Sequence, residues 1–146
     1  MSGRFTGWSA SHLAGGSDGR LRLLWNNTNG AAALWILNAD GSFNSAASYG
    51  PIAGWSAVDV GVSNDGTARI LWANTNGSAA VWSVNLAFGV SSASIYGPFP
   101  GYTPARIDVG ADGLVRLLWN AVDGTTALCV LDANRNFLLS GTFGPL

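Results

Sequence analysis

The sequence predicts an all-β protein assembled from repeated four-stranded units, and three observations lead to this prediction. One segment occurs three times at a spacing of 47 residues, as DGRLRLLWNNTNGAAALW from Asp18, DGTARILWANTNGSAAVW from Asp65 and DGLVRLLWNAVDGTTALC from Asp112. The chain contains no Lys, Glu or Gln, so several of the strongest helix-forming residues are missing. Short apolar runs rich in Trp, Val, Leu and Ile alternate with Gly, Asn and Asp, which is typical of strands joined by tight turns.

The repeat covers nearly the whole chain without insertion or deletion. Its units span about residues 6–52, 53–99 and 100–146, and they form a single domain. A hydrophobic fraction of 48% in 146 residues is enough for a packed core. A fixed period of this length is typical of solenoids, propellers and other arrays, in which each unit packs against its neighbours.

Each unit divides into four short strands separated by turn signals. In the second unit we expect strands over about residues 56–62, 67–73, 79–84 and 91–96. The Asn-Asp-Gly and Asn-Thr-Asn-Gly segments between them supply the left-handed and turn conformations that hairpins need at little steric cost. The same pattern recurs in the other two units.

The middle strands, such as RLLW and ALWIL, are apolar on both faces, which favours a sheet that is covered on each side. A four-stranded unit that repeats at a constant period and is covered on both faces describes a β-propeller blade. The alternative is a monomeric β-trefoil, which also contains three four-stranded repeats. The strands that are apolar on both faces favour the propeller.

Propellers close with about four to eight blades, so three blades per chain cannot close a ring alone. The chain ends suggest how the ring is completed. The terminal segment Phe143-Gly144-Pro145-Leu146, followed by Thr6-Gly7-Trp8 of another copy, recreates the internal junction that joins the second and third units. We therefore expect a homodimer that forms a six-bladed ring with two seams.

Charge and hydropathy argue against nucleic acid, a membrane surface and a membrane span. The formal net charge of −1 provides no clustered basic face for nucleic acid or an anionic membrane. No segment reaches the roughly 18 consecutive apolar residues of a membrane span, and MSGRFTGW is too short and polar for a signal peptide. The chain as given is expected to be soluble. The single Cys129 replaces Trp35 and Trp82 of the other units, which predicts a buried and unreactive core residue.

The sequence offers no catalytic constellation. The only histidine, His12, has Asp59 and Arg106 as its repeat counterparts, so no general base recurs. No pair of carboxylates is marked for glycoside hydrolysis, and no Cys/His cluster has metal-ligand spacing. We expect no enzyme activity, no metal and no cofactor.

The series DGRLRLLW, a polar turn, AALWIL, and YGP followed by GW resembles the blade of tectonin-like and fucose-lectin-like bacterial propellers. This resemblance implies a sugar site between adjacent blades, formed by an Arg of the second strand, a Glu of the third strand and a stacking aromatic ring. The three repeated arginines match the Arg position. The third-strand positions near Ala33-Leu34, Ala80-Val81 and Ala127-Leu128 hold no Glu, so the resemblance does not extend to fucose specificity of that type.

Aromatic rings for stacking and polar groups for sugar hydroxyls recur in every unit, and several weak sites on one rigid body gain avidity on a glycan surface. The candidate ligand-binding residues are Arg22, Arg69, Arg116, Trp8, Trp55, Tyr102, Trp25, Trp72 and Trp119.

Each candidate also has a structural interpretation. Trp25, Trp72 and Trp119 are suited to fill the space between blades, and Trp35 and Trp82 are expected in the core. The arginines are suited to inter-blade salt bridges with Asp18, Asp65 and Asp112. Two functions therefore stand: a multivalent carbohydrate-binding protein with sites between blades, or a structural or protein-interaction scaffold, a natural fragment or engineered, without its own ligand.

Overall fold

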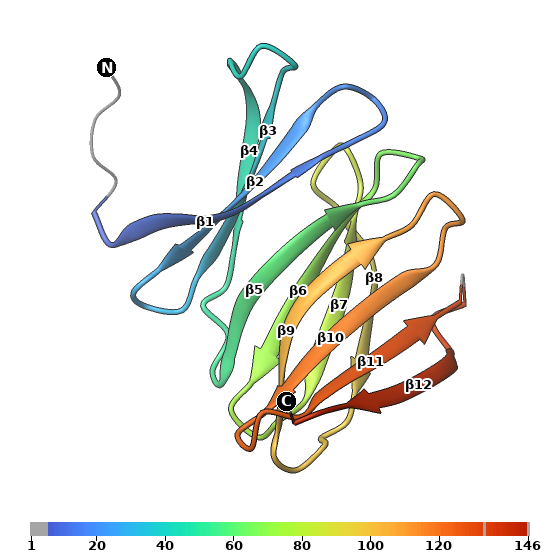
Figure 1. Ribbon diagram of the computed structural model, residues 1–146. Helices are drawn as coiled ribbons and strands as arrows, with labels where there is room; N and C mark the ends of the chain where they lie inside the picture. Colours follow the sequence, from blue (N-terminus) through green and yellow to red (C-terminus); the bar gives the residue numbers. More distant parts are fainter. Residues whose placement is uncertain (1–5, 133, 146) are drawn as a thin grey trace.

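A computed structural model describes residues 6–132 and 134–145 and folds them into twelve strands in three antiparallel sheets (Figure 1). The structure does not describe residues 1–5, which belong to the segment MSGRFTGW considered above as a signal peptide. It also does not describe Leu146, which belongs to the predicted junction between copies. Within the described ranges no residue is helical, and no helix is therefore long and apolar enough to cross a membrane.

Each repeat forms one four-stranded sheet, in which the strands follow the order of the chain. The first blade contains β1 (Trp8–Gly15), β2 (Leu21–Asn27), β3 (Ala32–Leu37) and β4 (Phe43–Tyr49). The second contains β5 (Trp55–Val62), β6 (Ala68–Asn74), β7 (Ala79–Val84) and β8 (Val90–Tyr96). The third contains β9 (Tyr102–Val109), β10 (Val115–Ala121), β11 (Thr126–Leu131) and β12 (Phe137–Phe143).

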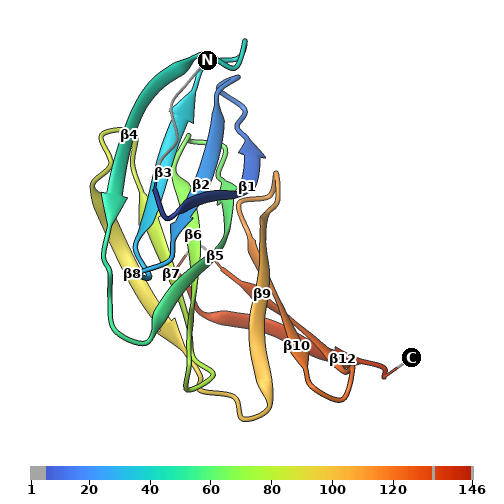
Figure 2. The same ribbon diagram turned by 90° about the vertical axis from the view of Figure 1, so that its left-hand side faces the viewer.

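The sheets are arranged as propeller blades. Their first strands β1, β5 and β9 contact one another in sequence, whereas β4, β8 and β12 form the far edges (Figures 1 and 2). This confirms the predicted all-β architecture of four-stranded repeats. The trefoil alternative is wrong, because a trefoil would combine strands of all repeats in one barrel, whereas here no strand of one repeat pairs with a strand of another.

The turns explain why Asp-Gly recurs between the first two strands of every blade. The carboxylates of Asp18, Asp65 and Asp112 each accept the backbone N–H two residues later, at 3.0, 2.9 and 3.0 Å. This side-chain turn stabilises the hairpin through contacts within the turn itself. The following glycines have φ between 79° and 85°, a region that side chains with a Cβ rarely adopt.

Two hydrophobic cores separate the three blades. One lies between the first and second blades and includes Leu24, Val60 and Ile70. The other lies between the second and third and includes Leu71 and Leu117. The adjacent residues Ile70 and Leu71 of β6 are both fully buried, yet they belong to different cores. The second blade is therefore covered on both faces, as the apolar pattern predicts.

Truncating a residue of such a core tests the inter-blade packing. Leu24→Ala removes a fully buried side chain between the first two blades, and we expect it to lower the free energy of unfolding by about 2–5 kcal/mol. The matched variant Leu138→Ala removes an exposed leucine of β12 and should change it by no more than about 0.5 kcal/mol. Urea denaturation followed by fluorescence measures both; equal effects would contradict this core assignment.

Candidate functional site

An aromatic hollow recurs at the same place in all three blades, and we call these three hollows the repeat pockets. The first is lined by Trp8, Trp25, Ala33, Trp35, Ala46, Ala47 and Ser48. The second is lined by Ile52, Trp55, Trp72, Ala80, Trp82, Ala93 and Ile95. The third is lined by Phe99, Tyr102, Trp119, Ala127, Cys129, Phe137, Gly141 and Thr142.

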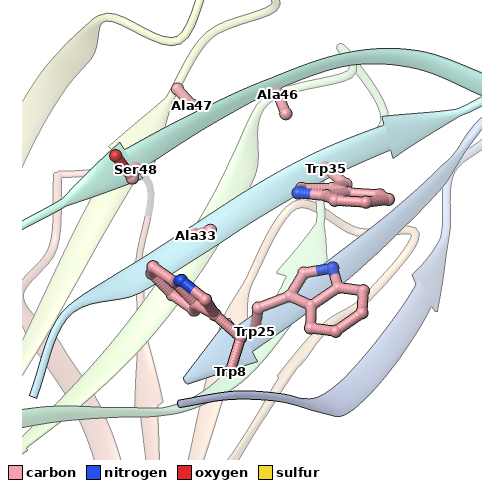
Figure 3. A pocket seen from close by; sticks show the side chains of 7 residues that line it. All are labelled: Trp8, Trp25, Ala33, Trp35, Ala46, Ala47 and Ser48. Atoms are coloured by element: carbon pink, nitrogen blue, oxygen red, sulfur yellow. The ribbon is translucent and has the colours of Figure 1, made fainter. Parts of the chain in front are cut away.

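The strand register creates these hollows by placing alanines beside tryptophans. In the first blade, Trp25 of β2 pairs with Ala33 of β3, and Trp35 of β3 pairs with Ala46 of β4. A large ring beside a methyl group leaves a depression in the sheet surface, with the rings as its walls (Figure 3). The second blade repeats the arrangement, because Trp72 pairs with Ala80 and Trp82 with Ala93.

The rings are held in a fixed relation within each pocket. Trp25 and Trp35 lie 4.9 Å apart between ring centroids at 42°, and Trp72 and Trp82 lie 4.7 Å apart at 45°. Contacts of this kind favour one orientation of each ring beyond simple burial. The pockets of the first two blades are accordingly preorganised.

The third pocket is wider than the other two. Its volume is about 560 Å³, against about 270 Å³ in the first and 210 Å³ in the second. Cys129 replaces the tryptophan of the other blades, and the ring of Phe99 packs on Trp119 at 5.0 Å. Cys129 is buried, as the sequence predicts, and burial raises the pKa of its thiol, which keeps it protonated and unreactive.

All six aromatic candidates from the sequence line these pockets: Trp8, Trp55, Tyr102, Trp25, Trp72 and Trp119. Trp35 and Trp82, expected in the core, are only partly buried and line the pockets too. Their place in the pockets follows from the strand register, which sets an alanine of the neighbouring strand opposite each ring. In the sequence, Ala33 and Ala80 are marked only as third-strand positions that hold no Glu.

The pocket walls are apolar, and their polar groups lie among the outer-strand residues. The Nε1 atom of Trp72 is buried and has no hydrogen-bond partner among the described residues, so Trp72 offers the second pocket no accessible indole N–H. Ser48 and Thr142 supply hydroxyls to the first and third pockets, whereas Ile95 takes their place in the second. The pockets suit an uncharged ligand with an apolar face.

The three repeated arginines do not line the pockets. Arg22 lies on the opposite face of β2 from Trp25 and is fully buried. Its guanidinium donates to both carboxylate oxygens of Asp18, at 2.8 and 2.9 Å, and to the carbonyl of Gly66 in the next blade, at 2.8 Å. Arg116 pairs in the same way with Asp112, at 3.0 and 2.8 Å.

Arg69 takes different partners, and a single upstream position explains the difference. A Cβ at Gly16 would lie 2.6 Å from both Arg22 Nη1 and Asp18 Oδ1, so the Arg–Asp pair requires glycine there. The second blade has Ser63 at the equivalent position, and Arg69 donates to its hydroxyl at 2.9 Å and to the hydroxyl of Ser83.

The expected inter-blade salt bridges therefore need correction. The ion pairs of the first and third blades are formed within a blade, and Arg22 reaches the next blade through its hydrogen bond to the carbonyl of Gly66. Gly66 and Trp72 are separated by six residues, or about 20 Å of extended strand. The structure brings the aromatic candidates together and leaves the arginines at the other end of the blade.

The first strands also bring together His12, Asp59 and Arg106, which occupy the same repeat position. His12 Nδ1 lies 3.5 Å from Asp59 Oδ1 and 3.0 Å from Arg106 Nη1. The Asp59 carboxylate already accepts the backbone N–H groups of Val60 and Ile107, each at 2.9 Å, which is a structural role. Among the described residues no cluster of three or more His, Cys, Asp or Glu has the geometry to hold a metal ion.

Comparison with known proteins supports the fold only. No protein-family model and no curated protein matches the chain. The chain is similar to a solved structure described as a protein of unknown function from Bacteroides caccae, with 12% sequence identity and a TM-score of 0.50. The match covers 94% of this chain and 62% of the other, so this chain spans less than two thirds of that protein's length. The chain is thus an all-β protein of repeated four-stranded antiparallel units.

The Arg22–Asp18 pair predicts a defined acid sensitivity. Hydrogen bonding from Arg22 lowers the pKa of Asp18 to about 2, so the pair stabilises the fold above about pH 4 and is lost as the pH falls towards 2. We expect Asp18→Asn to lower the melting temperature at pH 6 and to lose this effect near pH 2. In an Arg22→Met background the same substitution should have little effect at any pH; an undiminished effect there would contradict the pairing.

Proposed function

We propose that the chain is a multivalent carbohydrate-binding protein and that each repeat pocket holds one sugar ring. The observation that supports this proposal is the recurrence of one aromatic hollow at the same place in three blades. Packing alone does not require a hollow, because a larger residue at the alanine positions would fill it.

The pocket chemistry fits the apolar face of a sugar. Tryptophan rings provide flat surfaces for the C–H face of a pyranose, and hydroxyls such as those of Ser48 and Thr142 supply hydrogen bonds at its edge. No charged residue is among the described residues that line the three pockets, which favours neutral sugars. The aromatic residues carry the proposed site, and the arginines support the blade.

Shallow pockets of this kind bind single sugars weakly, and repetition compensates for that weakness. Linked sites on one rigid body gain avidity by about 10²–10⁴ when the ligand is itself repeated on a surface. The tectonin-like and fucose-lectin-like propellers that this sequence resembles are a precedent for sugars bound between blades. The target would be a glycan coat and not a free monosaccharide.

The alternative function is a scaffold without a ligand of its own. The near-complete burial of Trp72 and Trp119 favours this alternative, because rings that are covered by neighbouring blades contribute packing whether or not a ligand binds. The two functions differ in what happens when a partly exposed pocket ring is removed.

Trp35→Ala is the substitution that distinguishes them, because it removes a partly buried wall of the first pocket. On a glycan array that displays neutral oligosaccharides, we expect the wild type to bind and this variant to bind at least about tenfold more weakly, which corresponds to 1.4 kcal/mol. Ser48→Ala should weaken binding less, and Leu138→Ala, outside the pockets, should leave it unchanged.

The native mass of each variant is measured beside its binding, so that altered assembly is not mistaken for a lost site. A wild-type protein that gives a β-rich circular dichroism spectrum but binds no glycan on a diverse array would overturn the proposal in favour of the scaffold. Unchanged binding by Trp35→Ala at unchanged mass would show that the first pocket is not a site.

A further inference from the structure

The first blade leaves uncovered a face that is buried in the other two blades. Leu13 of β1 is 60% exposed, whereas its repeat counterparts Val60 and Ile107 are 4% and 6% exposed. Trp25 is likewise more exposed than Trp72, although both stand at the same repeat position. The first blade therefore presents to solvent the surface that the second and third blades bury against their predecessors.

The third blade leaves the opposite face uncovered. Phe143 at the end of β12 is 60% exposed, whereas its counterpart Tyr96 is 8% exposed and packs against the next blade. Arg116 is partly exposed, whereas its counterpart Arg22 is buried against the second blade. The two uncovered faces lie at the two ends of the stack of blades (Figure 2).

These two end faces are the two halves of one repeated interface, because each internal interface joins the same pair of surfaces. We infer that a second copy of this chain covers both end faces, with the last blade of each copy packed on the first blade of the other. The result is a closed ring of six blades with two identical seams, related by a two-fold axis.

Hydrogen bonds of the internal interface specify contacts at the seam. Between the first and second blades, Arg22 donates to the carbonyl of Gly66 and Asn26 Nδ2 donates to the carbonyl of Ala57, at 2.8 and 2.7 Å. In the third blade, Arg116 and Asn120 stand at these donor positions. At the seam they would donate to the carbonyls of the partner's Gly19 and the partner's Ala10.

The amide donor recurs in the third blade, where no blade within the described residues accepts from it. The second blade has Ala73 at the position of Asn26 and Asn120, so its interface with the third blade lacks this bond. The third blade, which has no successor within the chain, has the asparagine again. A second copy supplies the acceptor carbonyl, whereas an unrelated partner would have to reproduce both end surfaces of the repeat.

The native mass tests this inference directly. Light scattering should give twice the 15.1 kDa of one chain. Leu13→Asp in the first end face and Phe143→Asp in the last should each yield a folded monomer, because both side chains are exposed in the single chain. Leu86→Asp, an exposed position in the β7–β8 turn, is the matched control and should remain a dimer.

Cross-linking tests the head-to-tail arrangement. Ser17 Oγ donates to the carbonyl of Asn64 at 3.0 Å, and Asn64 Nδ2 donates to the carbonyl of Ala111 at 2.8 Å, so these equivalent positions adjoin from blade to blade. At the seam, Ala111 should adjoin the partner's Ser17. A Ser17→Cys/Ala111→Cys double variant treated with a short bis-maleimide should form covalent dimers, whereas either single variant should not.

A monomeric wild type at micromolar concentration, or a particle larger than two copies, would overturn the inference. So would a dimer that Leu13→Asp dissociates but Phe143→Asp leaves intact, because that result indicates two first blades packed face to face. The inference is independent of sugar binding: a dimer that binds no glycan retains the ring and loses only the proposed function.

Discussion

Burial of both faces of a thin sheet is the constraint on which the structure depends. Neighbouring residues of the middle strands point to opposite sides of a sheet, so a single blade would leave its apolar faces in water. In β6, Ile70 and Leu71 reach full burial only because a blade lies on each side.

The two ends of a blade contain different interactions: an ion pair at the Asp-Gly turns and aromatic hollows at the other end. At the Asp-Gly turns, the Arg22 guanidinium fastens its own hairpin through Asp18 and reaches the next blade through Gly66. A buried guanidinium is stable there because its charge is paired with a carboxylate. The far end of the strands contains no such charge, and there the tryptophans meet alanines and leave hollows. The charged pair and the hollows therefore lie towards different ends of one strand.

The strands and their order could be predicted from the sequence because both depend on local signals. Turn residues, apolar runs and the 47-residue period all recur without a gap, and the second blade was placed within one residue at each strand end. The two-sided apolar pattern was enough to predict that blades lie on both faces.

Three features depend on contacts that the sequence does not display. The choice between Asp and Ser as the partner of the repeated arginine is decided by a glycine or serine six residues upstream, through a steric contact across the hairpin. The meeting of His12, Asp59 and Arg106 depends on the curvature that brings three first strands together. The hollows required the cross-strand register that pairs Trp25 with Ala33.

Differences among the repeats depend on whether a position is buried between blades or exposed in a pocket. Leu24 and Leu71 stand at the same repeat position, and both are fully buried between two blades. The outer-strand position of the pockets varies, as Ser48, Ile95 and Thr142 show, and all three side chains are exposed. The six-bladed ring that we propose would present several related but unequal pockets at fixed spacing, and a repeated, chemically mixed surface would match it better than one small molecule.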